Sequence, residues 1–135
     1  MRAQFVKTVS KIIRDDADAV LLLGDIGVFG FRHILSNYSD RAYNIGILEQ
    51  STISLAAGMS LNGLVPIVHT IAPFLVERAL EQIKIDLCYQ DLGANLVSVG
   101  ASYDYAALGC THHCPSDIPT LNEIPNIELI VPSNN

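Results

Sequence analysis

A short, uninterrupted apolar run, Ala19 to Leu23, is followed directly by Gly24-Asp25 and limits the possible folds more than any other segment. Five apolar residues in a row are typical of a strand that is covered on both faces. Further strands are predicted at 41–45, 64–69, 95–101 and 127–131. Because strands that alternate with helices pair in parallel through right-handed crossovers, the chain is predicted to form an α/β fold.

Apolar residues recur at helical spacing between the predicted strands. Helices are expected at 5–14, 31–37, 49–61, 76–89 and 117–122, with a loop at 102–113. This succession predicts one domain, 1–135, built on a doubly wound, mostly parallel sheet with helices on both faces. Ligands of such sheets bind at the carboxyl ends of the strands, so the residues that follow each strand are the candidates for a functional site.

Composition excludes several classes of function. Half of the 135 residues are apolar, 16% are charged, and the net charge is −6. Binding to nucleic acid without sequence preference needs a basic face, so no nucleic-acid partner is expected. The sequence has no apolar run of membrane-spanning length and no signal-peptide core, so no membrane association is expected. Three cysteines form no disulfide framework, which predicts a reduced, cytoplasmic setting.

The segment Asn44 to Gln50 places one carboxylate, Glu49, at the predicted start of a helix rich in small residues. A Glu in this position is ordinary, because the helix dipole favours a carboxylate there. The neighbours Ile47, Leu48 and Ile53 are apolar, however. A carboxyl group in such surroundings tends to have a raised pKa, which suits it to holding or sharing a proton.

Two other motifs suggest a ligand site on first inspection. Gly24 to Gly30 follows a strand, but its G-x-x-G-x-x-G spacing differs from the dinucleotide-binding pattern, so a tight turn is the favoured interpretation. Cys110 to Cys114 holds four potential zinc ligands in five residues. Adjacent side chains cannot all converge on one ion, so a polar loop that presents one imidazole is favoured. A nucleophilic cysteine remains a minor alternative.

Several blocks of sequence together resemble the pyrimidine-binding domain of transketolases. Their order and spacing cover the chain from about Leu21 to its end. The resemblance is strongest to the C-terminal subunit of a split transketolase or to the matching domain of deoxyxylulose-phosphate synthase. The blocks are Tyr43 to Gln50, Ala56 to Gly58, Asn62-Gly63 with Pro66, Thr70 to Phe74, Arg78 to Ile83, Gly109 to His113, Asp117-Ile118, Ile124-Pro125 and Val131 to Ser133.

This resemblance implies thiamine diphosphate as cofactor. In the family, a Glu at the Glu49 position hydrogen-bonds a ring nitrogen of the aminopyrimidine and so assists removal of the thiazolium proton. Taken alone, Phe74 is either a core or capping aromatic or a ring that stacks on a heterocycle. The resemblance implies the second role, with Arg78 close to the cofactor.

The same resemblance implies roles for four more residues. His112 is expected to face the substrate as a catalytic residue and to hydrogen-bond its oxygen atoms as charge develops. Asp25 and Thr70 are further candidates for the cofactor pocket, and His69 is a further candidate for substrate contact. Together with Glu49, these residues follow predicted strands or lie in the loop at 102–113, at the carboxyl edge of the sheet.

The implied activity is transfer of a two-carbon ketol unit between sugar phosphates. Leu108 and Cys110 depart from the family, which often has an acid and a proline there, so substrate recognition is less defined than cofactor binding. The alternatives are a beta-type subunit of deoxyxylulose-phosphate synthase or of a 2-oxo-acid dehydrogenase, and a non-catalytic assembly subunit. A flavodoxin-like binding module is disfavoured, because the sequence shows no phosphate loop.

The half of the family's site that binds the diphosphate is not recognisable here, and Gly24-Asp25-Ile26 does not match its Gly-Asp-Gly motif. No metal ligand is therefore assigned to this chain, and magnesium is expected to be held by a partner subunit or domain. A homodimer or heterotetramer is implied. The final residues, Pro132 to Asn135, are typical of a strand end and helix N-cap, so the chain is expected to be truncated at its C-terminal end.

Overall fold

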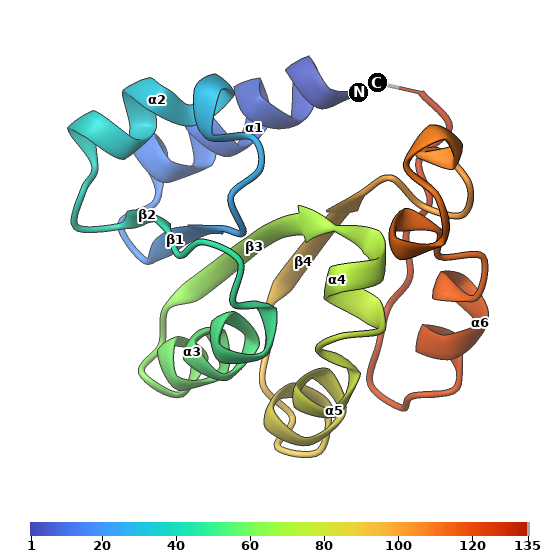
Figure 1. Ribbon diagram of the computed structural model, residues 1–135. Helices are drawn as coiled ribbons and strands as arrows, with labels where there is room; N and C mark the ends of the chain where they lie inside the picture. Colours follow the sequence, from blue (N-terminus) through green and yellow to red (C-terminus); the bar gives the residue numbers. More distant parts are fainter. Residues whose placement is uncertain (135) are drawn as a thin grey trace.

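The computed structural model describes residues 1–134. Within them, four strands form one parallel sheet in the order β2-β1-β3-β4 (Figure 1). These are β1 (Ala19–Leu23), β2 (Ala42–Asn44), β3 (Val65–Ile71) and β4 (Asn95–Val99). The chain forms β2 on one side of β1 and then crosses to the other side for β3. The predicted doubly wound α/β fold is confirmed, and its switch point lies between β1 and β3.

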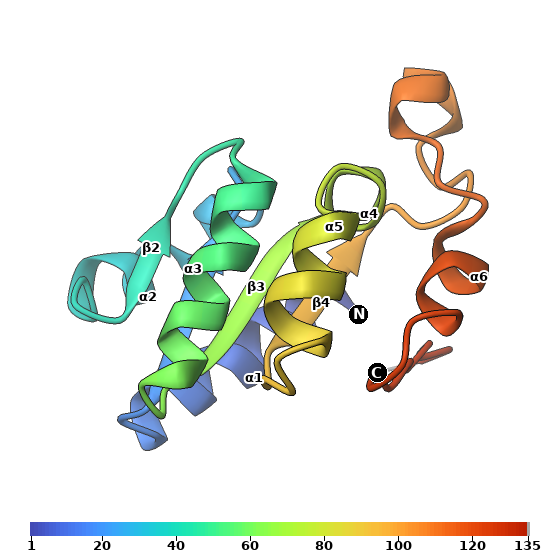
Figure 2. The same cartoon turned by 90° about the horizontal axis from the view of Figure 1, so that it is seen from below.

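Helices cover both faces of the sheet (Figure 2). One face is covered by α1 (Arg2–Asp15) and α2 (Val28–Asn37). The other face is covered by α3 (Glu49–Leu61), α4 (Ala72–Val76), α5 (Leu80–Gln82) and the π-helical turn η1 (Ile83–Cys88). The 3₁₀ turns η2 (Ala106–Leu108) and η3 (Cys110–His112) follow β4, and α6 (Asp117–Asn122) packs beside α4.

The central strands divide the core in two, because successive side chains of a strand point to opposite faces. Val20, Leu22 and Val68 pack under α3, α4 and η1. Leu21 and the other odd-numbered residues of β1 pack under α1 and α2. All five residues of β1 are buried, which explains the uninterrupted apolar run in the sequence. Each Leu buried in this way contributes about 1.5–3 kcal/mol.

Two predicted elements differ in the structure. The expected strand at 127–131 is wrong: residues 127–131 form no strand, and Ile130 and Val131 are 77% and 71% exposed. The Asn126 side chain donates a hydrogen bond to the Cys88 carbonyl oxygen, which holds this segment beside η1. The single helix expected at 76–89 is also interrupted, because residues 77–79 form a turn between α4 and α5.

Gly24, directly after β1, lies close against β3 at the carboxyl edge of the sheet. Its amide donates a hydrogen bond to the His69 carbonyl oxygen at 2.9 Å. A Cβ atom on residue 24 would lie 2.8 Å from Thr70 Oγ1 and 2.9 Å from Thr70 Cβ. The side chain of a buried strand residue has little room to withdraw, so this approach requires glycine.

Replacing Gly24 by Ala is therefore expected to destabilise the fold by about 1–3 kcal/mol, because the strand edge must shift to relieve the overlap. Chemical denaturation measures the change. Gly58→Ala is the matched control, since a Cβ there meets no atom within 4 Å and alanine is the better helix former. Equal stability of the Gly24→Ala and Gly58→Ala proteins would contradict the close approach.

Candidate functional site

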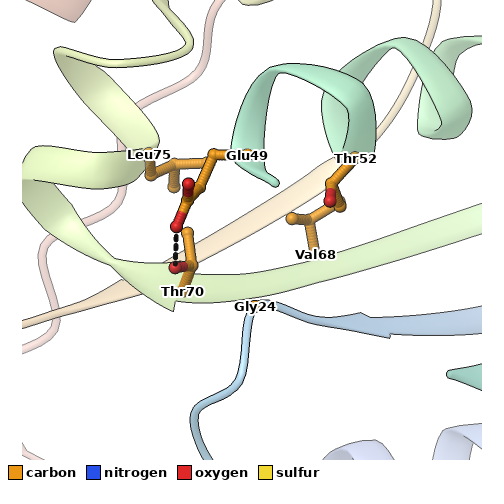
Figure 3. Close-up of a pocket in the computed structure, with 6 residues that line it drawn as sticks. All are labelled: Gly24, Glu49, Thr52, Val68, Thr70 and Leu75. Atoms are coloured by element: carbon orange, nitrogen blue, oxygen red, sulfur yellow. Dashed lines mark hydrogen bonds between the residues drawn. The ribbon is translucent and has the colours of Figure 1, made fainter. Parts of the chain in front are cut away.

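Glu49 is the first residue of α3 and is only 3% exposed. After β2 the chain turns through Gly46, whose φ of 84° is accessible mainly to glycine, and then enters the helix. This turn places the start of α3 over the switch point between β1 and β3. Figure 3 shows the carboxylate in a pocket that is lined by Gly24, Glu49, Thr52, Val68, Thr70 and Leu75.

Both carboxylate oxygens of Glu49 have polar partners. The Thr70 hydroxyl, on β3, donates to Oε1 at 3.3 Å (Figure 3). The Arg78 guanidinium donates to Oε2 at 2.7 Å and forms an ion pair. The apolar surroundings predicted for Glu49 are therefore only part of its environment, because a hydroxyl group and a guanidinium also contact its carboxylate.

Arg78 also joins Glu49 to the aromatic residues of the site. Its guanidinium carbon lies 4.2 Å from the centre of the Phe74 ring, a cation–π arrangement. The Phe74 ring in turn contacts His112 edge-to-face, with 5.2 Å between ring centres. Glu49, Arg78, Phe74 and His112 thus form one continuous row, although they come from three separate segments of the chain.

Asp25 lies at the edge of this site and contacts Asn44. The Asp25 amide donates to Asn44 Oδ1 at 3.0 Å, and Asn44 Nδ2 donates to Asp25 Oδ1 at 3.0 Å. Asp25 has a φ of 56°, so this reciprocal pair holds an unusual backbone turn directly after Gly24. The sequence assigned no role to Asn44. Its position at the end of β2 was the available signal, because Asn44 pairs there with Leu23 at the end of β1.

His69 is not brought together with Glu49. Neighbouring residues of a strand point to opposite faces, so Thr70 faces Glu49 while His69 faces α1. The His69 ring packs on Phe5, and its Nδ1 lies 2.8 Å from the Val97 carbonyl oxygen. Burial lowers the pKa of His69 below its ordinary value of 6.5. The ring borders a separate cavity of about 90 Å³, next to Gly27.

The cysteine motif forms no metal-binding cluster in the described part of the chain, and only one of its two thiols is accessible. Burial raises the pKa of the Cys114 thiol to about 12, so this sulfur stays protonated and unreactive. Cys110 is exposed. No group of three or more His, Cys, Asp or Glu side chains in residues 1–134 is arranged to hold a metal ion. No helix in the same range is long and apolar enough to cross a membrane.

The chemistry of the row suits a flat nitrogen heterocycle. The buried carboxylate of Glu49 accepts hydrogen bonds, and the half-buried ring of Phe74 offers an aromatic face beside it. The imidazole of His112 lies at the far end of the row, where it could hydrogen-bond a reacting group. These groups lie at the switch point of a doubly wound parallel α/β domain, where ligands of this class of fold bind.

The family model described as "Transketolase, pyrimidine binding domain" matches residues 1–135, and the chain belongs to this family. One subunit of an apulose-4-phosphate transketolase from Phocaeicola vulgatus is 31% identical over 132 residues, which are 97% of this chain and 42% of that protein. A 1-deoxy-D-xylulose-5-phosphate synthase from Carboxydothermus hydrogenoformans is 33% identical over 131 residues, 96% of this chain and 21% of that protein.

A protein from Rhodococcoides fascians, described as an uncharacterized 33.6 kDa protein in the fasciation locus, is 42% identical over 99% of this chain and 43% of its own length. A solved structure described as "Split gene transketolase, inactive beta4 tetramer" superimposes with a TM-score of 0.79 at 26% identity, over 93% of this chain and 40% of that one. The chain spans less than half the length of each of these relatives. It is the pyrimidine domain of a transketolase-type, thiamine diphosphate-dependent protein.

The buried His69 predicts a pH dependence of stability. Because burial lowers the pKa of His69 in the folded state, unfolded chains take up a proton at a higher pH than folded chains as the pH falls through 6.5. Stability is therefore expected to decrease between about pH 7 and pH 5 in part through His69, and His69→Gln is expected to flatten this part of the curve. Denaturation at several pH values measures it. The same substitution at exposed His33 is the control, and an unchanged slope in His69→Gln would contradict the assignment.

Proposed function

We propose that the complete protein transfers a two-carbon ketol unit between sugar phosphates with thiamine diphosphate as cofactor. The observation that carries the proposal is the buried Glu49 carboxylate at the switch point of the sheet, linked through Arg78 to the half-buried ring of Phe74. When bound, thiamine diphosphate supplies an acidic thiazolium carbon and an electron sink for cleaving a bond next to a carbonyl group. The relatives that are transketolase subunits support this reaction class.

Glu49 is proposed to exchange a proton with the ring nitrogen of the aminopyrimidine. Its carboxylate is shielded from water, so the proton is held between two groups and is not lost to solvent. The Thr70 hydroxyl fixes the direction of Oε1. Phe74 is proposed to stack on the pyrimidine, and Asp25 to close the cofactor pocket from the end of β1.

His112 is proposed to contact the substrate. It is half-buried at the open end of the row, and its Nδ1 lies 3.0 Å from Thr111 Oγ1, which restrains the ring. This arrangement leaves Nε2 to hydrogen-bond a hydroxyl or carbonyl oxygen on which negative charge develops. The packing of His69 against Phe5, on the other face of the sheet, gives no support to a direct substrate contact by His69.

The remaining half of the site is proposed to come from a diphosphate-binding subunit or domain that also holds magnesium. Large apolar side chains are exposed around the entrance to α3 and along its outer face, which supports a partner surface there. They are Ile47, Leu48 and Leu55, together with Ile85 in the neighbouring η1 turn and Tyr89 directly after this turn. The similar split-gene transketolase is described as an inactive beta4 tetramer, which supports an oligomer here; a homodimer or a heterotetramer with the partner is proposed. The three free cysteines support a reducing compartment such as the cytoplasm.

Glu49→Gln is expected to reduce proton exchange at the thiazolium carbon by at least about 100-fold in the complex with the partner, because the amide cannot exchange a proton with the ring. Hydrogen–deuterium exchange followed by NMR measures the rate. Glu81→Gln is the matched control, since Glu81 is an exposed carboxylate at the nearby start of α5. Exchange at the normal rate in Glu49→Gln would refute the proposed role.

Thiamine diphosphate with magnesium is expected to raise the melting temperature of the chain strongly only when the diphosphate-binding partner is present. Leu55→Glu is expected to weaken this effect, because it places a charge in the proposed partner surface. Thermal-shift titration measures both. Phe29→Glu, at an 80% exposed position on α2 and on the other face of the sheet, is the control. A strong shift for the isolated chain would show that the site is complete without a partner.

A further inference from the structure

The Arg78 guanidinium makes the two contacts that the proposed function assigns to the cofactor ring. It lies over the face of Phe74 at 4.2 Å and donates to the Glu49 carboxylate at 2.7 Å. We infer that the Arg78 guanidinium occupies the place of the aminopyrimidine ring in the free protein. It is displaced from this place when the ring binds. This inference rests on the proposed function. It adds that Arg78 competes with the cofactor ring for the site and thereby selects which ligands can bind.

The geometry of the pocket supports an exchange of occupants. The pocket between Glu49 and the sheet, which Thr52, Val68 and Thr70 help to line, leaves no space for even a water molecule, so a ring cannot reach the carboxylate from that side. Arg78 contacts both the carboxylate and the Phe74 ring, so a ring that makes both contacts must displace the guanidinium. The Glu49 side chain is 3% exposed and is fixed at the first turn of α3, whereas the Arg78 side chain is 37% exposed. Arg78 is therefore the group that can leave for solvent.

The backbone at Arg78 fits the same role. Residues 77–79 form the turn between α4 and α5, and the Arg78 amide donates to the Pro73 carbonyl oxygen over a long 3.2 Å. Phe74, in contrast, lies within α4, whose Ala72, Pro73, Leu75 and Val76 are buried. The aromatic face is thus built on a packed helix, while the guanidinium projects from a turn. A displacement of Arg78 does not require the site itself to unfold.

Displacement requires a ligand of a particular chemistry. The guanidinium is a planar cation with N–H donors, so it satisfies an aromatic face and a carboxylate together. A ligand that offers only a flat ring would leave the buried carboxylate without its partner, which is strongly unfavourable. A ligand that offers only a charge would not cover Phe74. Arg78 therefore selects for a flat heterocycle with an N–H donor or a shared proton on its edge.

The test measures binding of 4-amino-5-hydroxymethyl-2-methylpyrimidine, the pyrimidine half of thiamine, by calorimetry in the complex with the partner. Arg78→Ala is expected to bind this probe at least roughly fivefold more tightly than the natural chain, because the competing ion pair is removed and the buried carboxylate then lacks its guanidinium partner until the ring binds. Arg78→Lys, which keeps a charge for Glu49 but loses the planar group, is expected to lie between them. The matched control is Arg32→Gln, because Arg32 stacks on Phe29 in the same way on the outer face of α2.

NMR provides a second readout that does not depend on affinity. The side-chain N–H signal of Arg78, identified by its loss in Arg78→Lys, is expected to move to the position of an exposed arginine when the probe is added. Benzyl alcohol, a flat ring without an N–H donor, is expected to leave the signal in place. Arg78→Lys also keeps the test valid if Arg78→Ala does not fold.

The outcomes separate this inference from the proposed function. Unchanged or weaker binding to Arg78→Ala and Arg78→Lys, together with an unmoved Arg78 signal, would show that Arg78 is a permanent contact of the bound ring and would overturn the inference alone. Absence of binding to the natural chain and to every folded variant would overturn the proposed function as well. Tighter binding and a moved signal support both.

Discussion

The structure depends on one buried charge. Glu49 lies at the switch point of a parallel sheet with 3% of its surface exposed, and such a carboxylate is stable only if other groups replace the water that it has lost. Thr70 and Arg78 do so, one from β3 and one from the turn after α4. The carboxylate thereby connects α3, the central strand and the following helices at a single point. The contacts of Glu49 with Thr70 and Arg78 therefore both join elements of the fold and form part of the candidate site.

The sequence predicted the parts of this arrangement that follow from topology. The apolar run of β1 and the alternation of strands with helices determine a doubly wound sheet, and such a sheet brings the ends of its strands to one edge. Glu49 and Thr70 therefore meet even though no local pattern connects them. The resemblance to the transketolase family added Arg78 and His112, whose positions depend on a turn and on a long loop that no periodicity describes.

Other features depend on details that the sequence does not determine. His69 and Thr70 are neighbours, yet only one can face Glu49, and that choice depends on the register of β3 against β1. The segment at 127–131 has strand-like composition, but Asn126 and the packing of Ile127 hold it beside η1, away from the edge of β4. The pairing of Arg78 with Glu49 needs the interruption between α4 and α5, whereas the apolar spacing alone suggests a continuous helix.

A site of this kind meets two opposing requirements. The carboxylate has to be shielded from water if it is to exchange a proton with a bound ring, but the same shielding makes it unstable whenever the ring is absent. A side chain that paired with the carboxylate and was buried as permanently as Glu49 would block the ring. Water cannot take this role from the side of the sheet, because the pocket there is closed. An arginine on a turn, long enough to reach the carboxylate and exposed enough to leave, satisfies both requirements. The ion pair of Glu49 with Arg78 thus explains how a carboxylate suited to a buried cofactor stays compatible with a folded, cofactor-free domain.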